Sequence, residues 1–296
     1  MYNEEGNIAA FVEAVERVVM GMGVPFEIVL VDDGSSDGTW ARIVAESKAH
    51  PALRGARLAR NFGHQGALMA GLCEARGQAV VSLDGDLQHP PELIPELFAR
   101  WREGYKVVTT QRADAVDTSL FKRTTSRWFY GVFSKLTGVA MEPGSSDFRL
   151  LDASAVSALS EMNDVDLFIR GSVSWLGFKS ITLPYRAAPR FSGTSKYGLK
   201  KMLRFASGAI LSFSLVPLRF GIWIGFVTSG LAALELAYIL VQYARGATIT
   251  GWASVMTFLS LMFGILFVLL GIIGTYLGKI YEILKNRPRF LIGERT

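Results

Sequence analysis

Two long apolar runs near the carboxyl end constrain the fold of this chain more than any other feature. The first covers Phe220 to Tyr243 and holds one charged residue, Glu235, and the second covers Trp252 to Leu277 and holds none. Each run is long enough to cross a hydrocarbon core of roughly 30 Å as a helix. Two buried core helices are the alternative, but the short connection RGATITG between the runs favours a membrane hairpin.

Basic residues predict how this hairpin is oriented. The connection carries only Arg245, whereas both outer flanks are basic, through Lys200, Lys201, Arg204 and Arg219 before the hairpin and Lys279, Lys285, Arg287 and Arg289 after it. The positive-inside rule therefore predicts an inner (plasma) membrane protein with both termini in the cytoplasm. We expect the two spanning helices within 217–284 and a cytoplasmic tail at 285–296. Segment 198–216 mixes basic and apolar residues, which predicts an interfacial helix or an ordinary amphipathic linker.

Composition narrows the function classes further. The formal net charge is +5 and no long basic run occurs, so a nucleic-acid partner is not expected. The single cysteine, Cys73, allows no internal disulfide and fits a reducing compartment. The first residues, MYNEEGNIAAF, are polar and lack the apolar region of a signal peptide, so none is expected.

Residues 1–197 alternate helical and strand patterns ahead of the apolar runs. An amphipathic helix pattern covers Glu5 to Met22, and a short apolar strand pattern follows at Phe26 to Val31. Further strand patterns occur near Arg57, at Ala79 to Leu83 and at Lys106 to Thr110, with helical patterns between them. This alternation predicts an α/β domain with a mostly parallel sheet, whose ligands bind at the carboxyl ends of the strands.

Acidic loops follow two of the predicted strands. DDGSSDG follows FEIVLV, and DGDLQHPPEL follows the strand that ends near Leu83. Asp84 and Asp86 stand one residue apart, and two like charges so close are unfavourable unless a cation lies between them. Carboxylate oxygens favour Mg²⁺ or Mn²⁺, which would complete its shell with substrate phosphate and water. A D-x-D pattern alone is weak evidence, but the second acidic loop strengthens it.

Six motifs occur in order along the chain: MYNEEGNI, VDDGSSDGT, RNFGHQGALMAGL, SLDGDLQHPPE, SSDFRLLD and RFSGTSKY. In this order they resemble the motifs of family-2 glycosyltransferases, most closely the polyprenyl-phosphate group that includes dolichyl-phosphate mannose synthases and undecaprenyl-phosphate glucosyltransferases. The resemblance implies a Rossmann-like GT-A domain and a metal-dependent, inverting transfer of sugar from a nucleotide-diphospho-sugar. The donor would be similar to UDP-glucose or GDP-mannose, and the acceptor would be the phosphate of a membrane polyprenol such as undecaprenyl phosphate.

The resemblance also implies roles for particular residues. Those expected to bind the nucleotide-sugar are Tyr2, Glu4, Asp32, Asp33 and Asp84. Asp86 and Gln88 are the expected ligands of Mg²⁺ or Mn²⁺, and Asp84 and Asp147 are the expected catalytic residues. The expected contacts to pyrophosphate or acceptor phosphate are Arg112, Arg190, Ser195 and Lys196.

Several of these residues have structural alternatives. Asp32 and Asp33 could cap a helix and a turn, and Asp147 could pair with Arg149. We interpret Asp147 first as an organiser of the acceptor or sugar and second as a base, because a phosphate acceptor is already anionic near neutral pH. His64 is interpreted as a helix-start or loop residue. His89 could join the metal shell, but the adjacent Pro90 and Pro91 favour a turn residue, and both histidines are left out of the site.

One departure from the family pattern concerns the start of the domain. Family members begin with an apolar strand before the motif that here includes Met1 and Tyr2, so we expect the first strand of the sheet to be missing, through a misplaced start or a real truncation. A non-catalytic, membrane-anchored nucleotide-sugar-binding protein is therefore one alternative. A processive polysaccharide synthase is the other, although TTSRW at Thr124 to Trp128 lacks the expected glutamine. Small residues in the spans also predict a homo-oligomer.

Overall fold

A computed structural model describes residues 1–112, 145–162, 168–186, 216–246 and 251–296. The chain divides into two compact units, one formed by residues 1–206 with 288–296 and the other by residues 207–287. Three predicted phosphate contacts, Arg190, Ser195 and Lys196, lie outside the described residues. The predicted interfacial helix at 198–216 also lies outside them, except for its last residue.

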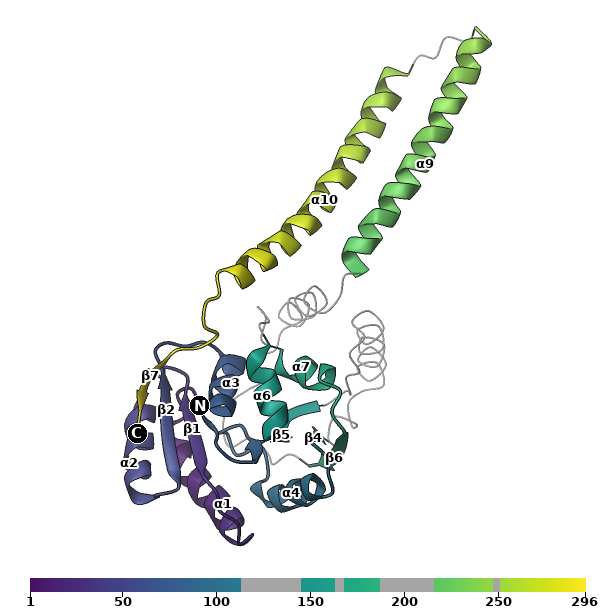
Figure 1. The fold of residues 1–296 in the computed structure, drawn as a ribbon. Helices are drawn as coiled ribbons and strands as arrows, with labels where there is room; N and C mark the ends of the chain where they lie inside the picture. Colours follow the sequence, from purple (N-terminus) through teal and green to yellow (C-terminus); the bar gives the residue numbers. More distant parts are fainter. Residues whose placement is uncertain (113–144, 163–167, 187–215, 247–250) are drawn as a thin grey trace. The chain divides into compact units, whose positions relative to one another are not determined.

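The strands of the first unit form two sheets (Figure 1). One sheet has the order β1-β2-β7 and the other has the order β3-β5-β4-β6. Their bounds are β1 (Ile28–Asp32), β2 (Leu53–Leu58), β3 (Ala79–Ser82), β4 (Val107–Arg112), β5 (Ser145–Asp152), β6 (Ser180–Tyr185) and β7 (Ile292–Arg295).

The predicted α/β class is confirmed, but the described pairings are mixed rather than mostly parallel. β1 pairs with β2 and β4 with β6 in parallel, whereas β5 runs antiparallel to both β3 and β4, and β7 runs antiparallel to β2. A crossover helix forces parallel pairing between the strands it joins. β5 and β7 instead follow long separating segments, so the sequence pattern did not fix their direction.

Helices cover both faces of the sheets (Figure 1). Side chains of α1, α2 and α4 share one apolar cluster with β1 and β5, and side chains of α3, α6 and α7 share another with β4 and β5. The bounds are α1 (Ile8–Met20), α2 (Thr39–Ala49), α3 (His64–Glu74), α4 (Ile94–Arg102), α6 (Ala153–Glu161) and α7 (Ile169–Trp175), with short 3₁₀ helices η1 (Glu5–Asn7) and η2 (Pro91–Leu93).

β5 is buried on both faces, which explains why the sequences of the central strands are continuous apolar runs. Leu150 and Leu151 are fully buried but belong to different clusters, because successive side chains of a strand point to opposite faces. Asp152 ends this strand and caps α6, its carboxylate accepting the Ser154 N–H at 3.0 Å. β5 therefore runs from the candidate site at Asp147 into the apolar core.

The second unit consists of two long apolar helices in the described residues. They are α9 (Val216–Ala244) and α10 (Trp252–Leu284), each somewhat longer than the span predicted from the sequence. By length and composition, Leu218–Ala244 and Leu261–Leu284 could each cross a membrane. A Cβ placed on Gly221 of α9 would lie 2.8 Å from Leu269 of α10, so the missing side chain allows a close approach.

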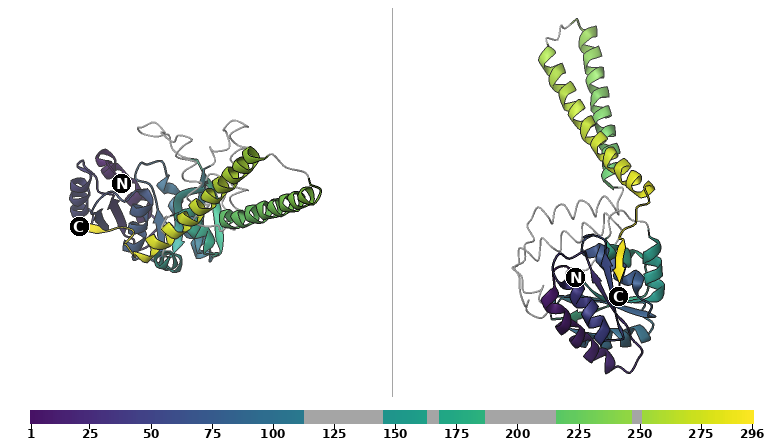
Figure 2. Two further views of the ribbon diagram at one scale, coloured as in Figure 1. Left: turned by 90° about the horizontal axis from the view of Figure 1, so that it is seen from above. Right: turned by 90° about the vertical axis from the view of Figure 1, so that its left-hand side faces the viewer.

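The carboxyl-terminal segment contributes a strand to the first unit (Figure 2). The carboxylate of Glu294 accepts hydrogen bonds from Trp40 Nε1 at 2.9 Å and Arg57 Nη1 at 3.0 Å. The Thr296 hydroxyl accepts the Gly55 N–H at 2.8 Å. Residues 288–296 therefore belong to the first unit and return the chain to it after α10, where the sequence predicted only a tail at 285–296.

Candidate functional site

The first two motifs pack against each other at the end of β1. The Asn3 N–H donates to Ser35 Oγ at 2.9 Å, and Asn3 Oδ1 accepts the Ser36 N–H at 3.0 Å. The Glu4 N–H donates to Thr39 Oγ1 at 2.9 Å. Two segments separated by about thirty residues therefore form one surface, as expected for motifs that share a site.

The carboxylates of Asp32 and Asp33 both accept hydrogen bonds from backbone N–H groups of the protein. The Asp33 carboxylate accepts the N–H groups of Phe62 at 2.7 Å and Gly63 at 3.0 Å, and Asp32 Oδ1 accepts the Ser35 N–H at 3.0 Å. Asp32 is fully buried. These side chains fix the loops around the cavity, which is the structural alternative raised from the sequence, and contact with a nucleotide stays a prediction for both.

The two carboxylates of the acidic loop after β3 are partly exposed. The Asp84 side chain is 38% exposed, and its oxygens lie 3.8 Å from His64 Nε2 and 3.7 Å from His89 Nε2, beyond hydrogen-bond distance. Asp86 Oδ1 accepts the Gln88 N–H at 3.1 Å. The Gln88 side chain is buried, unlike the half-buried carboxylates.

The buried side chain of His89 connects the acidic loop to β5. Its Nδ1 accepts the Asp84 N–H at 3.0 Å, which places the ring proton on Nε2, 2.9 Å from Ser146 Oγ. The ring stacks on Phe148 with centroids 5.2 Å apart. Burial lowers the pKa of His89. A neutral histidine therefore ties the acidic loop to β5, one residue before Asp147.

Asp147 is surrounded by three basic side chains. Its carboxylate accepts from Arg149 Nη2 at 2.5 Å, from Arg170 Nε and Nη2 at 2.9 and 2.7 Å, and contacts His64 Nε2 at 3.1 Å. Asp147 and Arg149 are both buried, whereas the Arg170 side chain is 38% exposed. We call Asp147, Arg149, Arg170 and His64 the Asp147 cluster.

The electrostatics of this cluster favour the ionised form of Asp147. Burial raises its pKa, but hydrogen bonds from His64 and Arg170 and the charge of Arg149 outweigh burial and hold the pKa far below its ordinary value. The same hydrogen bond raises the pKa of His64. Burial lowers the pKa of Arg149 to about 10, so this guanidinium stays charged at neutral pH. Asp147 is therefore a poor proton acceptor.

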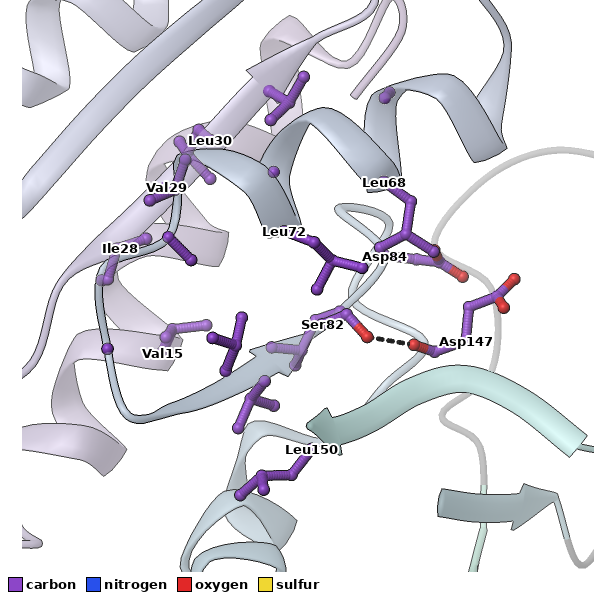
Figure 3. Close-up of a pocket in the computed structure, with 18 of the residues that line it drawn as sticks. Val15, Ile28, Val29, Leu30, Leu68, Leu72, Ser82, Asp84, Asp147 and Leu150 are labelled. Atoms are coloured by element: carbon purple, nitrogen blue, oxygen red, sulfur yellow. Dashed lines mark hydrogen bonds between the residues drawn. The ribbon is translucent and has the colours of Figure 1, made fainter. Parts of the chain in front are cut away.

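A cavity of about 2240 Å³ is lined by six of the nine predicted site residues that the structure describes. Those that line it are Tyr2, Glu4, Asp33, Asp84, Asp86 and Asp147. Asp84 and Asp147 lie beside each other at one end of it (Figure 3). Asp32, Gln88 and Arg112 do not line the cavity, and Arg112 is exposed at the end of β4.

The donor set fits a hard divalent cation only if substrate completes the shell. Within the described residues, no group of three or more His, Cys, Asp or Glu side chains is arranged to hold a metal. Asp84 and Asp86 nonetheless both line the cavity, and the Asp84 side chain is 38% exposed. Mg²⁺ commonly binds one or two carboxylates together with substrate phosphates and water, so these residues fit that mode.

Three residues of the site were missed or set aside at the level of sequence. His64 and His89 were interpreted as loop and turn residues, and Arg170 belongs to none of the six motifs. The sequence signal for His89 was its place within the acidic loop itself. Arg170 has no local signal, because its contact with Asp147 joins α7 to β5 in space.

The chain is similar in sequence to known glycosyltransferases. The sequence profile described as "Glycosyl transferase family 2" matches residues 1–155. An uncharacterized glycosyltransferase of Synechocystis is 36% identical, with 99% of this chain and 93% of that protein aligned. A prophage-derived bactoprenol glucosyl transferase of Shigella flexneri is 33% identical, with 99% of this chain and 95% of that protein aligned. Among solved structures, a mannosyltransferase of Pyrobaculum calidifontis in complex with GDP-Man and Mn²⁺ is 17% identical with a TM-score of 0.44, over 94% of this chain and 85% of that one.

Proposed function

The chain belongs to glycosyl transferase family 2, and from this premise we propose that it moves a sugar from a nucleotide-diphospho-sugar to the phosphate of a membrane polyprenol. The observation that carries the proposal is the 33% identity to a bactoprenol glucosyl transferase along 99% of the chain. That alignment includes both the acidic loop and the two apolar helices. Because this relative is named a glucosyl transferase, we prefer a UDP-glucose-like donor over a GDP-mannose-like one.

Asp84 and Asp86 are the residues we assign to the donor side. Asp86, with Asp84 beside it and Gln88 as a further candidate ligand, would hold Mg²⁺ or Mn²⁺ against the pyrophosphate. The bound cation would neutralise charge that develops on the departing nucleoside diphosphate. Tyr2 and Glu4, with Asp32 and Asp33 behind them, are proposed to shape the nucleotide end of the cavity.

Asp147 is proposed to organise the site rather than to accept a proton. Its oxygens are already engaged by Arg149, Arg170 and His64, and its pKa lies far below the ordinary value. Through these contacts it holds the guanidinium of Arg170 at the cavity wall, where an anionic phosphate can bind.

The acceptor needs little help from a base. A phosphate monoester has a second pKa of about 6, so one of its oxygens is a ready nucleophile near neutral pH. That oxygen would form a bond to the anomeric carbon while the bond from this carbon to the donor phosphate breaks. A single displacement inverts the anomeric configuration. Arg112, Arg190, Ser195 and Lys196 remain proposed contacts to phosphate.

The apolar helices fit a lipid acceptor. We propose that α9 and α10 span the inner membrane with both chain termini in the cytoplasm, as the basic flanks predict. With this topology the first unit and the acceptor phosphate would both be on the cytoplasmic side. Small residues on both helices, Gly225, Ser229, Gly271 and Gly274, support association into a homo-oligomer.

The test is lipid-linked product formation by the purified full chain. The assay would contain undecaprenyl phosphate, Mg²⁺ or Mn²⁺, and separately labelled UDP-glucose and GDP-mannose. We expect a lipid-soluble sugar phosphate with one donor and at least 100-fold less with Asp86→Asn. Glu92→Gln, which changes an exposed acid in η2, should keep wild-type activity. Donor binding without product from any donor would instead favour the non-catalytic alternative.

A further inference from the structure

Gln65, in the first turn of α3, connects this helix to α7. Its side-chain Oε1 accepts the Ile169 N–H at 3.1 Å, across 104 residues of sequence. Gln65 also lines the cavity described above, and it belongs to the motif RNFGHQGALMAGL. The proposed sugar transfer gives this side chain no role.

The hydrogen bond from Ile169 takes the place of a cap at the start of α7. The first N–H groups of a helix have no partner within it, and a side-chain oxygen just before the helix commonly accepts one of them. α7 is preceded by Phe168, whose side chain contains no acceptor. Ile169 is 2% exposed, so water cannot readily replace the amide oxygen of Gln65. The start of α7 therefore depends on an acceptor that α3 provides.

Apolar packing alone would leave the position of α7 along α3 loosely defined. Met69 and Leu72 of α3 belong to the same buried cluster as Ile169 and Val173 of α7. Burial of apolar surface is non-directional, whereas an N–H···O hydrogen bond fixes both a distance and an angle. The bond from Ile169 to Gln65 therefore sets where α7 begins relative to α3.

The next residue of α7 is Arg170, which lines the cavity. Its Nε and Nη2 donate to the two carboxylate oxygens of Asp147 at 2.9 and 2.7 Å. This two-point contact requires a particular orientation of the guanidinium, so a shift at the start of α7 would disturb it. His64, directly before Gln65, contacts Asp147 Oδ2 at 3.1 Å. Two adjacent residues of α3 therefore hold both sides of this ion pair, His64 the carboxylate and Gln65 the helix that carries the arginine.

We propose that Gln65 is a positioning residue for the sugar transfer proposed above, on which this inference rests. Through Ile169 it holds Arg170 where the guanidinium binds a substrate phosphate. That phosphate belongs to the acceptor or to the donor pyrophosphate, since both present the anionic oxygens that a guanidinium binds. Gln65 acts through Arg170 and is not itself a catalytic residue. Its effect on the reaction is large because a small displacement of a binding group slows a reaction that depends on alignment.

The test compares Gln65→Leu with Gln65→Glu in the purified full chain. Leucine removes the acceptor, whereas the carboxylate of glutamate can still accept the Ile169 N–H. The KM values for undecaprenyl phosphate and for the nucleotide-sugar would be measured separately, so that the affected KM identifies the phosphate that Arg170 binds. We expect Gln65→Leu to raise one KM by about tenfold or more while kcat changes by less than about threefold, and we expect Gln65→Glu to stay close to the wild type.

A double-mutant cycle with Arg170→Ala separates positioning from a general loss of stability. Because Gln65 acts through Arg170, Gln65→Leu should change the same KM by less than about twofold when Arg170 is already alanine. An equal fold increase in both backgrounds would overturn the proposal. So would wild-type kinetics of Gln65→Leu, or a Gln65→Glu variant as impaired as Gln65→Leu.

Hydrogen exchange on a peptide covering residues 168–175 keeps one part of the test independent of activity. Exchange at the start of α7 should be about tenfold faster in Gln65→Leu than in the wild type, and unchanged in Gln65→Glu. Equal exchange in all three proteins would overturn the positioning role, whereas a wild type that transfers no sugar would count against the proposed function. If Gln65→Leu fails to fold, Gln65→Ala takes its place in each comparison.

Discussion

The Asp147 cluster and the acidic loop of Asp84 and Asp86 lie in the same cavity, but their charges are balanced in opposite ways. Asp147 is buried and receives hydrogen bonds from two arginines and a contact from a histidine. Asp84 is partly exposed, and its ion-pair contacts among the described residues are two histidine nitrogens, 3.8 and 3.7 Å from its oxygens. Basic side chains of the protein balance the charge of Asp147, whereas Asp84 and Asp86 have no such close partner among the described residues. The cluster is therefore part of the framework, and the loop is the place where an external cation is useful.

Removing the carboxylate of the cluster should have the largest effect on folding. Asp147→Ala leaves Arg149 buried without its partner, and breaking a buried ion pair costs about 3–5 kcal/mol. We expect a loss of this size in the free energy of unfolding, measured by urea titration. Glu13→Ala, which removes an exposed ion pair with Arg17, is the control and should change stability by less than about 1 kcal/mol. An unchanged Asp147→Ala would contradict the framework role.

Acidification should weaken the same cluster. The pKa of Asp147 is depressed in the folded state, so its contribution is present above the unfolded value of about 3.9 and is lost as the pH falls below it. We therefore expect the Tm of the wild type to fall more steeply than that of Asp147→Ala between pH 5 and about pH 3. Parallel curves for the two proteins would show that other carboxylates govern the acid response.

His89 connects the two regions, so its loss should affect both to a smaller degree. His89→Leu leaves the Asp84 N–H and Ser146 Oγ without their buried partner, which costs about 1–3 kcal/mol. We expect a lower Tm and a severalfold higher Mn²⁺ concentration for half-maximal activity. His50→Leu is the control for metal dependence, because His50 does not line the cavity; its loss can lower Tm, since His50 contacts Glu16 at 2.6 Å. A lower Tm with unchanged metal dependence would limit His89 to a structural role.

The smallest change in stability is expected in the acidic loop. Asp86→Asn removes one of two neighbouring like charges, so we expect a shift of less than about 0.5 kcal/mol, or a slight gain. In the wild type, Mn²⁺ with a nucleoside diphosphate should raise Tm by mass action, and this rise should disappear in the variant. Glu92→Gln should keep it. A large loss of stability in Asp86→Asn would contradict the proposal that the acidic loop, unlike the Asp147 cluster, contributes little to the stability of the fold.

Much of the organisation could be predicted from local patterns. The apolar runs predicted α9 and α10 because a long helix of apolar residues needs no information from elsewhere in the chain. The alternation of helices and strands predicted the α/β class, and the acidic loops were correctly placed at the carboxyl ends of β1 and β3. The direction of β5 and β7 could not be predicted, since each follows a long segment rather than a short crossover helix.

For the site, the sequence by itself determined which carboxylates follow which strands, because a strand and the loop after it are contiguous. Only the tertiary structure decided which partners surround each carboxylate and therefore how its charge is balanced. Arg170 reaches Asp147 across 23 residues of sequence and His64 across 83. Asp33 likewise meets the N–H of Phe62 from another loop. The ionisation and mobility of a carboxylate depend on the groups within a few ångströms of it, and those groups are brought there by packing rather than by order along the chain.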